Sequence, residues 1–294
     1  MEIRRLSACT LEEAVQAWND GFEGYYFNAT TTPEAFIKRM TAEELSPTLS
    51  VVAFKDNRPV GIVFSGVREA GGRKIAWNGG TGVAMPLRGS GNGRTLMEAS
   101  IAVLKEEGVV LSTLEAISEN AKAIALYEKL GYKIVDQLEH LNLKGAAPAN
   151  PLPGGIGIQG YTAKRAAPVQ AGQLPFYRAD YTWQTQWQNA KDGEAVIIRD
   201  EAGTPAGYAY FRKTYSPAGI HTATTLFQCE AAPDHPQAAG IIRLMLAYVF
   251  GDFSDDINRV VPNVPLTASA LTYSVLREAG FTTMAAQVQM VKEL

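Results

Sequence analysis

The apolar positions of the first half of the chain follow two patterns, one typical of β-strands and one typical of a helix. Short apolar runs bounded by turn residues predict β-strands. These runs cover residues 49–54, 60–67, 75–85 and 109–117. Before the last run, apolar and small residues recur at helical spacing, which predicts a helix with one buried stripe. The stripe consists of Leu96, Ala99, Ser100, Val103 and Leu104.

Cap and turn residues place the ends of these elements. Thr10 and Glu13 form a capping box at the start of a first helix. Pro33 lies in the first turn of a second helix, and Pro86 ends the strand at 75–85 because proline cannot donate to a strand ladder. With a further strand at residues 1–7, the predicted order is β-α-α-β-β-β-α-β-α-β. We therefore expect an α/β fold, a twisted mixed sheet flanked by helices.

The second half of the chain repeats features of the first. The repeated segments, at offsets of about 144 to 149 residues, are 51–61 with 195–207 and 130–132 with 279–281. A stretch rich in Ala, Pro and Gly separates the halves, and such composition is typical of a linker. An internal duplication follows. The predicted division is a first domain at 1–146, a linker at 147–164 and a second domain at 165–294.

A glycine-rich loop follows Pro86 and opens the helix that carries the buried stripe. It contains Arg88-x-x-Gly91-x-Gly93. Glycines let main-chain N–H groups approach an anion, and a helix N-terminus adds partial positive charge, so the loop suits a phosphate. Two other phosphate-binding loops do not fit, because a Walker loop requires Lys and the dinucleotide fingerprint requires Gly at the position of Arg94.

Two further motifs follow this loop. Residues 109–117 form an apolar strand that contains Glu115, and a helix pattern runs from Asn120 through Leu126-Tyr127 to Gly131-Tyr132. In this combination the chain resembles the GNAT (Gcn5-related) N-acetyltransferases over roughly residues 50–142. With the duplication, the resemblance implies tandem GNAT-like domains. It also implies acetyl-CoA as co-substrate and direct transfer of its acetyl group to an amine.

The resemblance assigns residues to acetyl-CoA. The main chain of Val83 and Met85 would hold the pantetheine arm, and Asn120 would contact the same arm. The pyrophosphate would lie against Arg88, Gly89, Gly91, Gly93 and Arg94. Asn92 departs from the apolar residue that is usual at this position of the loop.

Acetyl transfer requires that the amine lose a proton and that the departing thiolate gain one. Tyr127 occupies the position of the family's general acid, and the alternative is a helix tyrosine that packs on the sheet. Glu115 matches the glutamate that acts as base in some members. An ionised carboxylate in an apolar strand needs a partner or a function, so Glu115 is either the base or a structural partner.

Composition restricts the classes of function that the chain could have. The chain has 294 residues, 46% apolar and 19% charged, and is globular and long enough for two cores. With a net charge of −3, the chain lacks the excess of basic residues that is typical of a nucleic-acid binder. The two cysteines and three histidines show no metal-ligand spacing, so we expect no metal. Without a long apolar run or a leader segment, we expect no membrane association and a cytoplasmic protein.

These observations predict an acetyl-CoA-dependent N-acetyltransferase that acts on a small-molecule or peptide amine. The alternative is a non-catalytic acyl-CoA-binding regulatory module. The aromatic residues at 22–27 either belong to the core or line a substrate groove. Residues 229–240 lack the glycine cradle and Leu276 stands at the position of Tyr127, so the second domain is expected to be degenerate. The acceptor and the oligomeric state stay open.

Overall fold

The computed structural model describes residues 1–147, 151–152 and 158–294. The chain divides into two compact units. Unit 1 comprises Met1–Val135 and Gln289–Leu294, and unit 2 comprises Asp136–Val288. The predicted linker at 147–164 therefore lies within the span of unit 2, and its residues 148–150 and 153–157 are outside the described residues. The functional division into 1–146 and 165–294 stays a prediction.

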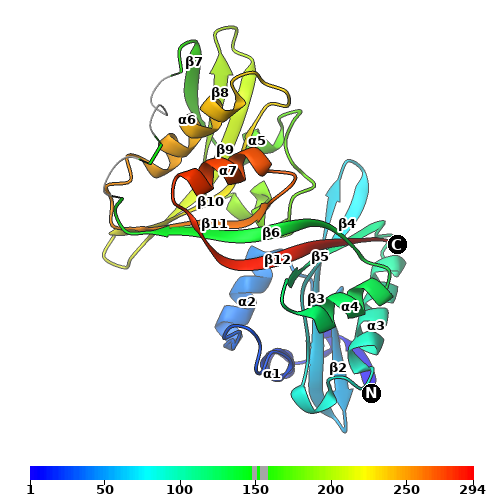
Figure 1. Ribbon diagram of the computed structural model, residues 1–294. Helices are drawn as coiled ribbons and strands as arrows, with labels where there is room; N and C mark the ends of the chain where they lie inside the picture. The colour runs from blue at the N-terminus through cyan, green and yellow to red at the C-terminus, as the bar shows by residue number, and fades with distance from the viewer. Residues whose placement is uncertain (148–150, 153–157) are drawn as a thin grey trace. The chain divides into compact units, whose positions relative to one another are not determined.

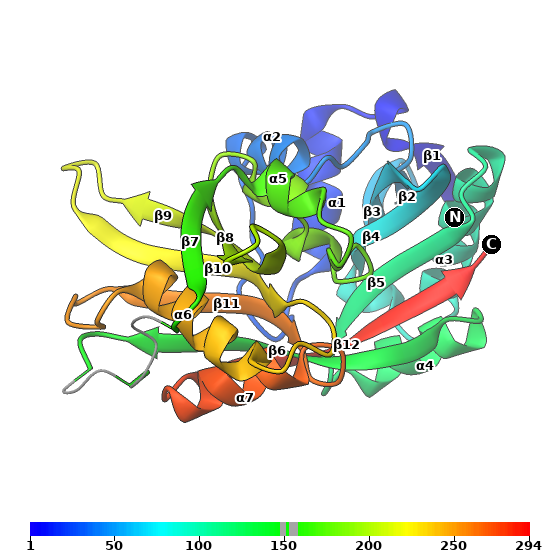
Figure 2. The same cartoon turned by 90° about the horizontal axis from the view of Figure 1, so that it is seen from above.

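Unit 1 has the predicted α/β order of elements. Its strands are β1 (Glu2–Arg5), β2 (Val51–Lys55), β3 (Arg58–Ala70), β4 (Arg73–Val83), β5 (Leu111–Ile117) and the start of β6 (Lys133–Lys144). Its helices are α1 (Leu11–Gly21), α2 (Pro33–Ala42), α3 (Asn92–Glu106) and α4 (Ala121–Lys129), with 3₁₀ turns at Leu6–Ala8 and Met85–Leu87. Helices α1 and α2 cover one face of the sheet and α3 covers the other (Figures 1 and 2).

The strands of unit 1 are antiparallel from β1 to β4, and β4 and β5 are parallel. The parallel pairing joins residues 75–78 to residues 111–114. Within the described chain it goes no further, although β4 continues to Val83 and β5 to Ile117. The two strands therefore part at Asn78 and leave one edge of the end of β4 without a strand partner. We call this place the β4–β5 wedge.

Glycines allow α1 to lie directly on β4. A Cβ atom on Gly82 would lie 2.9 Å from the main-chain carbon of Gly21, which ends α1. Gly80 leaves similar room for the ring of Trp18. Because the neighbours of Gly82 are main-chain atoms, larger residues there would push the helix away from the sheet. The glycines of β4 thus fix the distance between α1 and the wedge.

The last strand of the chain, β12 (Thr282–Glu293), contributes its end to unit 1. The Leu294 N–H donates to the Val110 carbonyl oxygen at 3.1 Å. The Leu294 side chain packs on a buried cluster of Ala76, Leu104 and Val109. Residues far apart in sequence therefore complete the core of unit 1.

Unit 2 repeats the arrangement of unit 1. Its further elements are β7 (Tyr161–Ala166), α5 (Pro168–Gly172), β8 (Glu194–Asp200), β9 (Pro205–Tyr215), β10 (His221–Ala231), α6 (Ala238–Phe250), β11 (Asn258–Pro265) and α7 (Ala270–Glu278), with 3₁₀ turns at Trp183–Thr185 and Trp187–Ala190. The strand order is β6-β11-β10-β9-β8-β7. Strands β10 and β11 are parallel only at residues 223–225 and 258–260. Helices α6 and α7 cover one face and α5 the other (Figure 2).

Candidate active site

The loop between β4 and α3 has an exposed row of main-chain donors. Gly89 and Gly91 have φ angles of 78° and 87°, which glycine adopts at little cost. The N–H groups of residues 89–94 have no acceptor in the part of the chain that the structure describes. Helix α3 begins directly at Asn92, so its positive end adds to this row. Together these groups fit a phosphate or pyrophosphate.

The two arginines of the loop have different surroundings. The Arg88 guanidinium donates to three main-chain oxygens, those of Val83 (2.7 Å), Gly21 (3.0 Å) and Glu23 (2.7 Å). It thus joins the end of β4 to the end of α1, a contact that the sequence motif did not indicate. Arg94 is exposed and forms an ion pair with Glu98 at 2.8 Å, one turn further along α3. The predicted contacts of both with a pyrophosphate stay predictions.

The wedge lies just before this loop. At its closed end, Asn78 is buried, donates to the Thr81 hydroxyl (2.8 Å) and accepts from the Gly80 N–H (3.0 Å). These bonds stabilise β4 at the register shift between Asn78 and Gly80, where β4 and β5 part. Val83 and Met85 follow at the open end, where the Met85 side chain is 49% exposed. Their role toward a pantetheine arm stays a prediction.

Tyr127 lies on α4 and is buried, with 7% of its surface exposed. Burial raises the pKa of its phenol to about 12, and an interaction with the Thr81 hydroxyl opposes that rise. Its ring lies 6.0 Å from the ring of Tyr132, whose hydroxyl is 2.7 Å from Ser112 Oγ. The phenol is therefore protonated at neutral pH and can donate a hydrogen bond.

Glu115 lies on β5 and is held by Trp77 of β4. The indole N–H donates to Glu115 Oε2 at 2.7 Å. The other oxygen, Oε1, contacts no solvent and has no hydrogen-bond partner among the described residues. The pKa of Glu115 is raised to about 7: burial raises it most, the bond from Trp77 opposes that rise, and the Glu43 carboxylate adds a smaller rise. A carboxyl group with this pKa changes charge near neutral pH.

Asn120 and the aromatic residues lie at the start of α4. Asn120 Oδ1 accepts from the Ala123 N–H at 3.2 Å and so caps the helix. The Tyr26 hydroxyl donates to the Glu119 carbonyl oxygen at 3.2 Å, while the Tyr26 ring stays 52% exposed. Phe22, in contrast, stacks on Trp18 at 4.2 Å. The aromatic segment 22–27 therefore divides between the two interpretations, with Phe22 packed and Tyr26 exposed.

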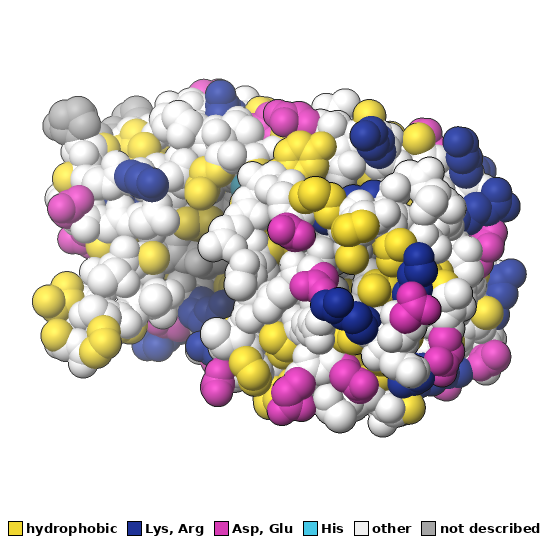
Figure 3. Space-filling model, turned by 90° about the horizontal axis from the view of Figure 1, so that it is seen from below, with side chains coloured by type: hydrophobic (Ala, Val, Ile, Leu, Met, Phe, Trp, Pro, Cys, Tyr) yellow, Lys and Arg dark blue, Asp and Glu magenta, His cyan; other side chains and the backbone are white. Residues whose placement is uncertain are grey.

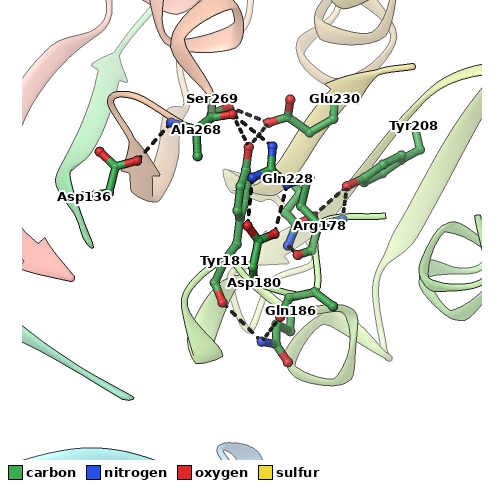
Figure 4. Close-up of polar contacts among 11 residues, drawn as sticks. Asp136, Arg178, Asp180, Tyr181, Gln186, Tyr208, Gln228, Glu230, Ala268 and Ser269 are labelled. Carbon is green, nitrogen blue, oxygen red and sulfur yellow. Dashed lines mark hydrogen bonds and ion pairs between the residues drawn. The ribbon is translucent and has the colours of Figure 1, made fainter. Parts of the chain in front are cut away.

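Unit 2 has side chains where unit 1 has its wedge. Glu230, near the end of β10, accepts from the Tyr181 hydroxyl at 2.9 Å and from the Ser269 hydroxyl (Figure 4). The Thr272 hydroxyl donates to the Cys229 carbonyl oxygen at 2.5 Å. Burial raises the pKa of Glu230 to about 7. Leu276 is fully buried.

An ion pair adjoins this group, which we call the Glu230 cluster. Arg178 pairs with Asp180 at 2.8 Å, donates to the Ala268 carbonyl oxygen at 3.1 Å and lies 4.6 Å over the Tyr181 ring (Figure 4). Sequence reasoning missed the cluster. The only signal was a glutamate at the end of an apolar strand, and its partners lie about 40 to 50 residues away in either direction.

The described part of the chain meets the requirements of neither a metal site nor a membrane span. It contains no group of three or more His, Cys, Asp or Glu residues placed to hold a metal ion. None of the described helices is long and apolar enough to span a membrane. On the face shown in Figure 3, acidic and basic side chains are interspersed.

Comparison with known families gives this geometry a context. The family described as Acetyltransferase (GNAT) matches residues 11–132, which contain the wedge, the loop, Glu115 and Tyr127. Residues 11–132 form a GNAT domain. GNAT proteins transfer an acyl group from acyl-CoA to an amine. No curated protein sequence matches the chain.

Solved structures show a similar fold over the whole chain. A GCN5-related N-acetyltransferase from Sphaerobacter thermophilus is 15% identical with a TM-score of 0.67, covering 99% of this chain and 95% of its own. A tandem GNAT protein from the clavulanic acid biosynthesis pathway is 14% identical with a TM-score of 0.61, covering 99% and 98%. A putative acetyltransferase from Pyrococcus horikoshii is 13% identical with a TM-score of 0.58, covering 100% and 89%. At these identities the likeness concerns the fold, which is the tandem GNAT fold that the sequence predicted.

Proposed function

We propose that the GNAT domain transfers the acetyl group of acetyl-CoA directly to a primary amine of a small molecule or peptide. The free N–H groups of residues 89–94 support binding of the CoA pyrophosphate. The pantetheine arm would follow the open edge of β4 at Val83 and Met85 toward the wedge, with Asn120 beside it. On this proposal the thioester would lie between the two predicted catalytic side chains, Glu115 and Tyr127.

The single observation that carries the reaction is the buried, unpartnered Oε1 of Glu115. A lysine-like amine is protonated at pH 7, and its deprotonation costs about 4–5 kcal/mol. Glu115 changes charge near pH 7, so its ionised form can take this proton. That proton binds Oε1, the neutral amine nitrogen attacks the thioester carbonyl carbon, and a C–N bond forms. The nitrogen then loses its second proton to solvent as the tetrahedral intermediate collapses.

The C–S bond breaks in the second half of the reaction, and negative charge develops on the CoA sulfur. The protonated Tyr127 phenol would donate a hydrogen bond to this sulfur. Because its pKa is about 12 and that of a thiol is about 8.5, complete proton transfer is uphill by about 5 kcal/mol. We therefore assign Tyr127 to stabilising the thiolate as it forms, with solvent supplying the final proton to the thiol.

Unit 2 would be a structural partner without a CoA site of its own. It lacks the glycine cradle, and Ser269 and Thr272 bond to the end of β10, where the pantetheine arm would lie in an active domain. One chain should therefore bind one acetyl-CoA. Calorimetric titration tests this, and a stoichiometry near two would contradict it.

The test of the reaction is a thiol-release assay with acetyl-CoA and a panel of amines. The panel should contain alkyl diamines, aromatic amines, amino sugars and peptides with a free N-terminus or lysine. We expect at least one amine to raise thiol release above the rate of hydrolysis, and Glu115→Gln to bind acetyl-CoA normally but transfer slowly. Tight binding of acetyl-CoA with no acceleration by any amine would support the non-catalytic acyl-CoA-binding module.

A further inference from the structure

Trp77 and Glu115 lie on neighbouring parallel strands. Trp77 is in register with Thr113, and Glu115, two residues further along β5, projects from the same face of the sheet. The indole is 2% exposed, so its N–H has little access to water. Gly79 makes room for it, because a Cβ atom there would lie 2.7 Å from the Trp77 ring. The local sequence of β4 therefore holds this donor in one place.

The bond from Trp77 makes the two carboxylate oxygens different. Oε2 accepts the indole N–H at 2.7 Å, and this bond restricts rotation of the carboxyl group. Oε1 is the oxygen without a protein partner among the described residues. A proton taken from an amine would therefore bind to Oε1. A buried acceptor without a partner costs stability, and a bound proton would relieve that cost.

The Glu43 carboxylate, at the end of α2, raises the pKa of Glu115 by its negative charge. Glu43 is the C-cap residue of that helix and pairs with Arg39 at 2.8 Å. Arg39 in turn donates to the Gly79 carbonyl oxygen at 2.6 Å and lies 4.6 Å over the Trp18 ring, so Glu43 is tied through Arg39 to β4 at Gly79. The adjacent Glu44 pairs with a different cation, Arg68, at 2.7 Å.

We propose that Trp77 and Glu43 are positioning residues of the base: the indole favours the ionised carboxylate of Glu115, and the Glu43 carboxylate favours the form that has accepted the amine proton. The proposal rests on the proposed function, since it needs Glu115 to be the base. The two residues have opposite effects, because a hydrogen-bond donor stabilises negative charge and a nearby carboxylate destabilises it. Their balance sets the lowest pH at which the domain works.

The test compares the pH dependence of kcat/KM in four proteins. Trp77→Phe removes the N–H and keeps an aromatic ring, so the acidic limb should move to higher pH and the rate at pH 6 should fall about tenfold, the size of one charge-assisted hydrogen bond. Glu43→Gln should move the limb to lower pH and raise the rate at pH 6 about twofold to fivefold. Glu44→Gln removes a neighbouring charge and should match the wild type.

Glutamate labelled with carboxyl ¹³C gives a readout that does not need turnover. The resonance assigned through Glu115→Gln should titrate at higher pH in Trp77→Phe and at lower pH in Glu43→Gln. Shifts in the same direction, or none in folded variants, would overturn the proposal even if transfer proceeds. Titrations that move as expected in a chain that acetylates no amine would instead refute the proposed function and leave the coupling intact. If Trp77→Phe does not fold, the comparison of Glu43→Gln with Glu44→Gln still tests the proposal, because only Glu43→Gln should move the titration of Glu115 to lower pH.

Discussion

Replacing Glu230 by Gln isolates the energetic effect of one ionisable group in unit 2. Glu230 Oε1 accepts the Tyr181 hydroxyl at 2.9 Å and also the Ser269 hydroxyl. A glutamine keeps an oxygen in the same position and nearly the same shape, so both bonds remain possible. What the substitution removes is the charge that Glu230 acquires as the pH rises.

The magnitude follows from the pKa. Burial raises the pKa of Glu230 from its ordinary value of 4.5 to about 7. At 1.36 kcal/mol for each pKa difference of one, this rise corresponds to about 3 kcal/mol. Because the folded-state pKa is the higher one, the stabilisation is complete below pH 4.5 and is lost as the pH rises through 7. The free energy of unfolding of Glu230→Gln relative to wild type should therefore increase by up to about 3 kcal/mol between pH 5 and pH 8.

Urea unfolding at pH 5, 6, 7 and 8 measures this difference. Comparing the two proteins at each pH cancels the titration of groups that they share, including Glu115. Tyr181→Phe is a companion variant, because loss of its hydrogen bond raises the pKa of Glu230 and should move the transition to higher pH. A difference between Glu230→Gln and wild type that stays constant from pH 5 to pH 8 would refute the reasoning.

Two substitutions test the site of unit 1. Gly91→Glu puts a negative charge beside the row of N–H groups, so the affinity for acetyl-CoA measured by calorimetry should fall at least tenfold, which is about 1.4 kcal/mol. Gly91→Ala is the control, because it carries the same backbone strain at φ 87° without the charge. Equal affinities in these two variants would show that the pyrophosphate lies elsewhere. Tyr127→Phe keeps the ring and removes the hydroxyl, so kcat should drop by about 10² to 10³, the usual cost of losing one transition-state hydrogen bond, with acetyl-CoA affinity nearly unchanged. Full turnover in Tyr127→Phe would return this residue to a packing role.

The parts of the structure that the sequence predicted are those encoded by nearby residues. The capping box at Thr10 is present, with Thr10 Oγ1 accepting from the Glu13 N–H at 3.2 Å and Glu13 Oε2 from the Thr10 N–H at 2.8 Å. The loop at 88–94 is likewise contiguous, so its glycine spacing was enough to indicate a row of free donors. Periodicity and turn residues gave the order of strands and helices for the same reason.

The parts that the sequence did not predict depend on register. Whether Trp77 reaches Glu115 depends on which residues of two parallel strands lie side by side, and no local pattern specifies this. The three carbonyl partners of Arg88 are likewise brought to it by the packing of α1 on β4. The Glu230 cluster joins residues from three separate segments. Each of these contacts is a product of the assembled sheet.

The place of residues 289–294 in unit 1 has a consequence for biosynthesis. The ribosome makes these residues after all of unit 2, yet Leu294 packs on the cluster of Ala76, Leu104 and Val109. Nascent domains generally fold in the order in which they emerge. Here the sheet of the GNAT domain stays incomplete beside β5 until translation has passed through unit 2. A fragment ending at residue 146 would lack this strand, and a dissected domain needs residues 289–294 restored, for example by circular permutation.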